Sequence, residues 1–254
     1  MQVRQAFIKR FVLPDGTLRG GTQTSYVLAL HFDLLPQELR SIAVAQLVQN
    51  IGQRANHLST GFVGTPYINW VLSEAGHLDT AYALLRQTTW PSWLYPVTQG
   101  ATTIWERWDG WTHDKGFQDP GMNSFNHYAY GAIGAWMYAV IGGIDLDPQK
   151  PGYKHIHLHP QPGGGLSHAK VDLQSMYGLI HSDWTIQADS FNLRVTIPAN
   201  TTATVFMPGT DLSCITENGL PAATAQGLTF LSMQNGYAVF LVESGSYSFS
   251  SRLQ

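Results

Sequence analysis

The sequence of 254 residues contains one cysteine and few charged residues, and both shortages exclude classes of protein. Because Cys214 has no partner, no internal disulfide can form, and the redox compartment of the protein stays open. Its simplest role is that of a buried packing residue. Charged residues make up 12% of the chain and leave a formal net charge of -3. Nucleic-acid binding needs clustered Lys and Arg, and no basic run occurs, so no nucleic-acid partner is expected.

Long apolar runs are also missing. The most apolar stretch, residues 129–144, is short and interrupted by four glycines, so it is read as a buried helix rather than a membrane span. The first residues lack the apolar segment and the small-residue cleavage site of a signal peptide. If Met1 is the genuine start, the sequence predicts a cytoplasmic protein with no membrane partner.

The chain does contain enough apolar material for a sizeable core, since 44% of its residues are hydrophobic. Up to about residue 145, apolar side chains recur at helical spacing, interrupted by Gly, Pro and Thr. Helices that follow one another in this way favour an α/α toroid or a helical bundle. We expect helices at residues 3–11, 24–32, 36–54, 65–74, 78–87 and 126–140.

The composition changes at DLDPQKPGY, residues 145–153, which contains two prolines and a glycine and is typical of a domain boundary. Short β-branched or aromatic segments follow, and Asn218-Gly219 and Asn235-Gly236 are typical hairpin turns. The sequence therefore predicts an α + β multidomain chain with a helical domain at 1–145 and an antiparallel β-sandwich at 146–254. Strands are expected at residues 155–159, 179–187, 191–197, 203–207 and 237–242.

Tryptophan is concentrated before residue 145, and Trp105, Trp108 and Trp111 flank Glu106. Indole faces stack on the apolar faces of pyranose rings, so a carboxylate among them is what a glycoside-binding site requires. A glycosidase uses two carboxyl groups, of which Glu106 is one candidate. The opposing interpretation is a core of aromatic rings in which Glu106 forms an ion pair with Arg107 or another cation.

The other polar candidates are less specific. Asp109, Asp114 and Asp119 lie in segments that also contain Gly, Pro or Lys, where a turn-forming role is equally expected. His127 stands at the start of the last expected helix, where a structural role is the commoner one. The run HIHLH, residues 155–159, places three imidazoles on one strand face, but they are spaced too widely to share an ion and no carboxylate accompanies them. Neither a metal site nor a cofactor is predicted.

Four ordered stretches of the chain resemble the bacterial α-L-rhamnosidases of glycoside hydrolase family 78. They are STGFVGTPY (59–67), GATTIWERWDGW (100–111), MNSFNHYAYGAIGAWMY (122–138), and PGY (151–153) with PQPGGGLSHAK (160–170). The resemblance covers nearly the whole chain. It implies the C-terminal half of an (α/α)6-barrel catalytic domain at 1–145, followed by a β-sandwich, and it implies hydrolysis of terminal α-L-rhamnosides with inversion.

The resemblance also implies roles for individual residues. The glutamate of the TTIWE motif in that family is the general base that activates water, which corresponds to Glu106. The histidine of NSFNHYAYG contacts the bound sugar, which corresponds to His127. Trp105, Trp108 and Trp111 are expected to form part of the wall of the sugar site.

The chain departs from the family pattern because the motif that carries the general acid is missing. It also contains too few helices for a complete barrel, so a fragment, a truncated gene product or one piece of a split enzyme is expected, and a second chain that completes the barrel is a candidate partner. Two other hypotheses stay open. One is a noncatalytic carbohydrate-binding or structural fragment, and the other is an α/α-toroid glycosidase with a different sugar specificity.

Overall fold

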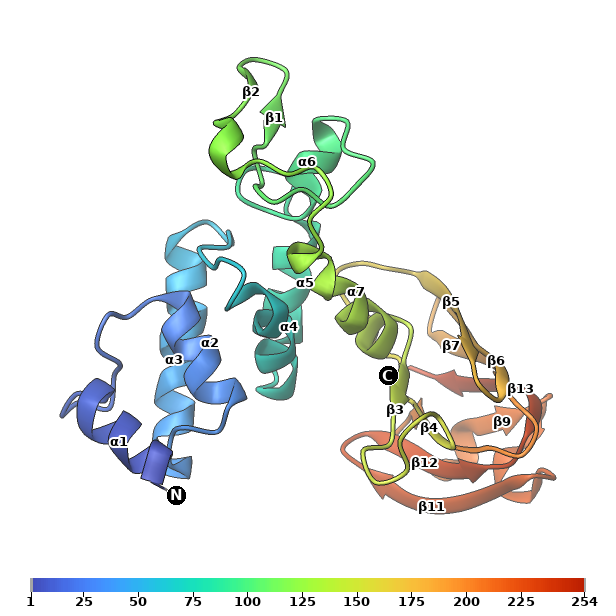
Figure 1. The fold of residues 1–254 in the computed structure, drawn as a ribbon. Helices are drawn as coiled ribbons and strands as arrows, with labels where there is room; N and C mark the ends of the chain where they lie inside the picture. The colour runs from blue at the N-terminus through green and yellow to red at the C-terminus, as the bar shows by residue number, and fades with distance from the viewer. Residues whose placement is uncertain (1, 254) are drawn as a thin grey trace. The chain divides into compact units, whose positions relative to one another are not determined.

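The computed structural model of the chain describes residues 2–253. The chain divides into two compact units, Met1–Gly134 and Ala135–Gln254. The first unit consists of helices and long loops, and the second is dominated by β-sheets (Figure 1). Within the described residues, every helix is too short or too polar to cross a lipid bilayer.

The helices expected from the apolar periodicity up to residue 87 are all present. Thr22 caps α2 through a reciprocal pair of bonds, in which its Oγ1 accepts from Ser25 N at 3.1 Å and its own N–H donates to Ser25 Oγ at 3.0 Å. Pro36 is the N-cap of α3. The helices are α1 Gln2–Phe11, α2 Gln23–His31, α3 Gln37–Gln53, α4 Thr65–Glu74 and α5 Leu78–Arg86.

Helix α2 is central to the first unit because it packs against both α3 and α4. The inward face of α3 contributes Ala43, Leu47 and Ile51, all fully buried. Burying one such leucine or isoleucine side chain stabilises the fold by about 1.5 to 3 kcal/mol. The outward face of the same helix carries the exposed Glu38 and Gln49, so α3 is amphipathic in the way its sequence indicates.

The expectation of a helical chain up to residue 145 is wrong between α5 and residue 128. Glycines and prolines recur through this segment and interrupt the backbone bonds that a helix needs. Its backbone groups instead bond to distant parts of the same segment. The regular elements there are α6 Leu94–Thr98, β1 Trp111–Thr112, β2 Gly116–Phe117 and the 3₁₀ turn Pro120–Met122.

The helix expected at residues 126–140 begins later and is irregular. It consists of the 3₁₀ turn η2 Ala129–Ala132, the short helix α7 Ile133–Trp136 and the π turn η3 Met137–Ile141. His127 lies in the loop before it, because its backbone N–H donates to Ile104 O at 2.9 Å rather than joining a helical turn.

The second unit contains two sheets, and every strand expected from the sequence is present in one of them. The ring centroids of Phe240 on β12 and Phe249 on β13 lie 6.0 Å apart, so the two sheets meet through buried aromatic rings. One sheet has the order β11 (Leu228–Gln234), β12 (Tyr237–Val242), β8 (Thr202–Pro208), β4 (His155–Leu158), β3 (Ile144–Leu146). The other has the order β10 (Leu220–Pro221), β9 (Ile215–Glu217), β13 (Gly245–Arg252), β7 (Ser190–Ile197), β6 (Gly178–Gln187), β5 (His168–Ser175).

The pairing of the strands corrects the expectation of a purely antiparallel domain at one place. Strands β4 and β8 are parallel, with His155 opposite Thr202, while the other strand pairs of the described chain are antiparallel. The long connection between β4 and β8 passes through the other sheet, which is how a parallel pair forms without a helical crossover.

The two Asn-Gly turns are confirmed as hairpin turns. Asn235 and Gly236 have φ of 50° and 82° and join β11 to β12. Asn218 and Gly219 have φ of 48° and 78° and join β9 to β10. Positive φ at both central residues is the geometry of a type I′ turn, which Asn followed by Gly adopts with the least strain.

The first residues of the second unit pack too closely for side chains at two positions. A Cβ on Gly142 would lie 2.4 Å from a methyl group of Val171, and one on Gly143 would lie 2.3 Å from Pro160 N. Trp184 is fully buried nearby and donates its indole N–H to Ile141 O at 2.7 Å. Gly142 and Gly143, two of the four glycines that interrupt the apolar stretch, therefore permit close packing in this unit.

Cys214 differs from its expected role as a buried packing residue. It is half-exposed and its thiol donates to Asp211 O at 2.8 Å, at the start of β9. The hydrogen bond belongs to a short 3₁₀ turn, Leu212–Cys214, which holds the thiol close to the surface.

His159 is expected to make the stability of the second unit depend on pH. Its ring stacks on Phe206 at 4.4 Å and meets the edge-on ring of Tyr237 at 4.6 Å. Burial, and to a lesser extent the neighbouring His157, lowers the pKa of His159 from 6.5 to about 4. Because the unfolded chain then binds the proton more tightly than the folded one, the free energy of unfolding should fall as the pH drops from about 6.5 to about 4, by about 3 kcal/mol.

The measurement is urea unfolding of the wild-type chain and of His159→Phe at pH 7 and pH 4. The variant should lose about 3 kcal/mol less than the wild type on acidification, since phenylalanine has no proton to bind. Ionisable groups that do not interact with His159 titrate equally in both proteins and cancel in the difference. An equal loss of stability in the two proteins would contradict the assignment.

Candidate active site

The segments that carry Glu106 and His127 are joined by hydrogen bonds. Glu106 N donates to Ser124 O at 2.8 Å, and His127 N donates to Ile104 O at 2.9 Å. Between them, Thr103 Oγ1 donates to the carbonyl oxygen of Phe125 at 2.5 Å. The two motifs of residues 100–111 and 122–138 thus lie side by side in irregular backbone.

The carboxylate of Glu106 is half-buried and, among the described residues, is held at one oxygen only. Its Oε2 accepts a hydrogen bond from Ser124 N at 2.8 Å. Arg107 pairs instead with Asp109, at 3.4 Å. Within residues 2–253, no cation lies within ion-pair distance of Glu106, so the alternative of an ion pair with Arg107 is wrong. A carboxylate oxygen without a cation can accept a proton from water.

A series of contacting aromatic rings leads from Trp93 to His127. The rings of Trp108 and Tyr130 stack at 3.7 Å with planes 11° apart, and Trp93 donates its indole N–H to Tyr130 O at 3.0 Å. Phe62 contacts Tyr130 at 5.2 Å and stacks on His127 at 4.7 Å. Phe62, a residue that the sequence did not single out, therefore helps to orient the His127 ring.

The phenol of Tyr130 connects this aromatic series to Glu106. Burial raises the pKa of Tyr130, Arg107 lowers it, and the charge of Glu106 raises it further. Tyr130 is the second residue missed by the sequence, and it lies in the same motif as His127.

The three tryptophans around Glu106 have different surroundings. Trp108 belongs to the aromatic series described above. Trp105 is 7% exposed and packs edge-on against Phe125 at 5.1 Å, so little of its ring is accessible. Trp111 lies in β1 and its ring contacts His113 at 4.8 Å.

A cavity of about 50 Å³ lies beneath the site, against Trp93, Trp105, Trp108 and Tyr130. It has room for about one water molecule and none for a sugar ring. Neither Glu106 nor His127 lines it. The expectation that Glu106 and His127 act on the same bound sugar stays a prediction.

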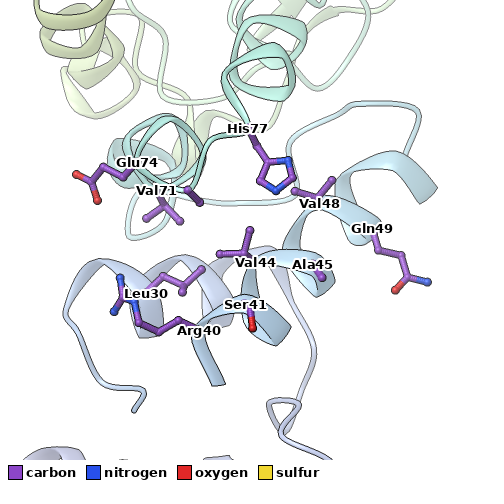
Figure 2. A pocket seen from close by; sticks show the side chains of 11 residues that line it. Leu30, Arg40, Ser41, Val44, Ala45, Val48, Gln49, Val71, Glu74 and His77 are labelled. Atoms are coloured by element: carbon purple, nitrogen blue, oxygen red, sulfur yellow. The ribbon is translucent and has the colours of Figure 1, made fainter. Parts of the chain in front are cut away.

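A larger groove of about 650 Å³ lies elsewhere in the first unit. Figure 2 shows the side chains that line this groove, which come from α2, α3, α4 and the turn before α5. Along the sequence, the lining residues run from Leu30 to His77. Val44, Val48 and Val71 give it an apolar floor, with Arg40 and Glu74 at its rim. It contains none of the predicted site residues.

A helical unit with a carboxylate beside stacked aromatic rings, followed by a unit of two sheets, is the arrangement of a helical-hairpin glycosidase. Residues 1–141 match the bacterial α-L-rhamnosidase 6 hairpin glycosidase domain, and residues 143–220 match the bacterial α-L-rhamnosidase C-terminal domain. The chain belongs to the bacterial α-L-rhamnosidase family, of which it represents a C-terminal part.

Two curated relatives illustrate how much of the family protein the chain covers. The α-L-rhamnosidase of Streptomyces avermitilis is 44% identical over 249 residues, which is 98% of this chain and 23% of the relative. An α-L-rhamnosidase of Formosa agariphila is 41% identical over 247 residues, or 97% of this chain and 26% of the relative. The chain thus spans about a quarter of the length of these relatives.

Solved structures agree with this placement. The Streptomyces avermitilis α-L-rhamnosidase complexed with L-rhamnose superposes with a TM-score of 0.89 at 43% identity, over 98% of this chain and 23% of that one. The native enzyme of Aspergillus terreus gives a TM-score of 0.82 at 36% identity, over 98% and 26% of the two chains. The enzyme of Dictyoglumus thermophilum gives 0.85 at 32% identity, over 98% and 27%.

Proposed function

We propose that this chain is the C-terminal part of an α-L-rhamnosidase that hydrolyses terminal α-L-rhamnosides with inversion. The observation that carries the proposal is the Glu106 carboxylate, which is oriented by Ser124 N–H, unpaired with any described cation, and tied through the backbone to the segment of His127. The names of the relatives, including one solved with L-rhamnose, support the choice of sugar.

In the proposed mechanism, Glu106 is the general base. Its carboxylate takes a proton from a water molecule while the water oxygen forms a bond to the anomeric carbon of the rhamnoside. The bond from that carbon to the leaving oxygen breaks, and the leaving oxygen takes a proton from a carboxylic acid. Because attack and departure occur on opposite faces of the ring, the product has the inverted configuration.

We place the general acid outside these residues. An inverting pair needs a second carboxyl group about 6.5 to 9.5 Å from the base. Asp109, the nearest carboxylate along the chain, is engaged by Arg107. We propose that the remaining part of the barrel, on the same longer protein or on a second chain, supplies the acid and covers helices of the first unit.

His127 is proposed to contact the bound sugar. The stacking of Phe62 on its ring and the packing of Phe62 on Tyr130 would hold the imidazole in place for that contact. Trp108, Trp105 and Trp111 are proposed as residues of the site wall. Of these, Trp105 is too buried to present a whole ring face, so its contribution would be to support Phe125 and the backbone beside Glu106.

In domain terms, we propose that the helical unit is half of an (α/α)6 barrel and that the two sheets of the second unit form its β-sandwich. The contact between Phe240 and Phe249 supports the second part of this proposal. The apolar floor of the groove in Figure 2 supports the first, since a complete barrel buries such helix faces against further helices.

A chimaeric enzyme tests the proposed function. Residues 1–254 would replace the matching last quarter of the Streptomyces avermitilis enzyme, and the product of aryl α-L-rhamnoside hydrolysis would be followed by NMR. The proposal requires turnover with the inverted sugar as first product. A folded chimaera that binds rhamnose without cleaving it would support the noncatalytic alternative, and a preference for another aryl glycoside would support a different sugar specificity.

A further inference from the structure

Three metal-binding side chains converge on one sheet of the second unit. His155 and His157 alternate along β4 and therefore lie on the same face. In the antiparallel pairing with β3, Leu146 lies opposite Ile156, so the next residue, Asp147, comes level with His155. One ligand atom from each of Asp147, His155 and His157 lies within 4.8 Å of the other two.

The carboxylate of Asp147 is oriented by a tight turn. Lys150 N donates to Asp147 O at 3.0 Å, and Gln149 N donates to Asp147 Oδ1 at 2.8 Å. Pro148 occupies the position that proline favours in a type I turn. These bonds engage the backbone carbonyl and the Oδ1 atom of Asp147. Its Oδ2 atom is available to bind a cation. The segment that the sequence indicated as a domain boundary thus presents a carboxylate to the histidines.

The ring of His155 is also held in place. It is 6% exposed, and its two nitrogens lie 2.7 Å from Thr202 Oγ1 and 2.8 Å from Thr204 Oγ1. A hydroxyl can donate or accept a hydrogen bond. One threonine can therefore accept the ring N–H of His155, while a metal ion replaces the other threonine hydroxyl as the partner of the second ring nitrogen. Histidine ligands in metal sites commonly have such a support on the second nitrogen, which fixes the tautomer.

The charges around the three residues permit a cation. Burial lowers the pKa of His155, with Lys150 and His157 acting in the same direction and Asp147 opposing them. Lys150 is the basic neighbour that opposes a metal ion. Its side chain is exposed, and solvent screens its charge.

We propose that Asp147, His155 and His157 bind one divalent transition-metal ion of the zinc type. Two imidazole nitrogens and a carboxylate suit Zn²⁺ and its neighbours, whereas Ca²⁺ and Mg²⁺ prefer oxygen ligands alone. With bonds of about 2.0 to 2.2 Å to each ligand, a tetrahedral ion needs ligand atoms about 3.3 Å apart, which modest side-chain rotation supplies. Water would complete the coordination. The ion would join the turn after β3 to β4, and this role is independent of the proposed hydrolysis.

The site was not predicted because the sequence shows only the spacing of HIHLH. His159 is not part of the cluster, which agrees with the expectation that three alternating histidines cannot share one ion. The second expectation, that no carboxylate accompanies them, is wrong. Asp147 joins the histidines through the pairing of β3 with β4.

The test is a calorimetric titration of the untagged, chelator-treated chain with Zn²⁺. We expect one ion per chain and a thermal transition at higher temperature in the presence of Zn²⁺, since the ion binds the folded chain preferentially. His157→Ala and Asp147→Asn should each weaken Zn²⁺ binding by about 100-fold. The matched control is His168→Ala, which removes an exposed histidine from β5 and should leave Zn²⁺ affinity unchanged.

Three outcomes would overturn the proposal. They are no binding by the wild-type chain, binding that survives both His157→Ala and Asp147→Asn, and a loss with His168→Ala as large as with His157→Ala, which would show adventitious binding to surface histidines. Circular dichroism of each variant guards against misfolding. Because Asp147→Asn keeps the size of the side chain and the oxygen that Gln149 N–H contacts, it decides the outcome if His157→Ala does not fold.

Discussion

Glu106→Gln in the chimaeric enzyme is expected to lower kcat by about 10² to 10⁴-fold, the usual contribution of general acid–base catalysis. The amide has the same shape as the carboxylate, and its oxygen can still accept the hydrogen bond from Ser124 N–H. What it cannot do is take a proton from water. KM should change little, because the binding contacts of the sugar are preserved.

Two controls separate loss of the base from loss of structure. Glu243→Gln makes the same chemical change at an exposed position of the second unit and should leave kcat unaffected. Added azide, which attacks without being deprotonated, should restore turnover to Glu106→Gln and yield the inverted rhamnosyl azide. A kcat within a few-fold of wild type for Glu106→Gln would remove Glu106 from the mechanism.

The isolated chain is expected to show little or no rhamnosidase activity. Its loss of kcat relative to the chimaeric enzyme should be at least as large as the loss caused by Glu106→Gln. Without a positioned acid, the leaving oxygen departs unprotonated, and much of the surface that orients the sugar is also proposed to lie on the rest of the barrel, so the two losses should compound. Nitrophenol departs readily without an acid, so an alkyl rhamnoside should show the larger deficit.

The assay compares the chain alone with the chain mixed with the N-terminal part of the Streptomyces avermitilis enzyme. Activity that appears only on mixing would support an acid supplied from outside. Robust turnover by the chain alone, removed by Glu106→Gln, would show that the acid lies within these 254 residues.

The helices were predictable because their signals are local. Five helices up to α5 follow from apolar spacing and from punctuation such as Gly76, whose φ of 80° ends α4. The loops from residue 87 to 128 were not predictable, because their backbone hydrogen bonds join residues far apart in the sequence, as the bond between Glu106 and Ser124 shows. Strand β13, GSYSFSSR, was missed because its serines have little strand preference, and pairing with β7 defines it instead.

The candidate site residues all lie in sequence motifs, and their roles stay predictions. Glu106 was a candidate from the tryptophans around it, and the roles expected of Glu106 and His127 came from the family resemblance. No spacing rule places Phe62 on His127 or Tyr130 on Trp108. The sequence did contain one signal for Phe62 and Tyr130, since both lie inside motifs that resemble the family. Contacts between separate motifs are a tertiary property that one sequence does not specify.

The cross-linked backbone of the two motifs also determines how this region unfolds. Glu106 and His127 stand on loops with little regular structure of their own, so the bonds between residues 103–106 and 124–127 are what keep each loop folded. Neither loop can open without releasing the other, which makes them one cooperative unit. A substitution that loosens either loop, such as Ser124→Pro with its missing N–H, would therefore displace both groups together rather than weaken one of them.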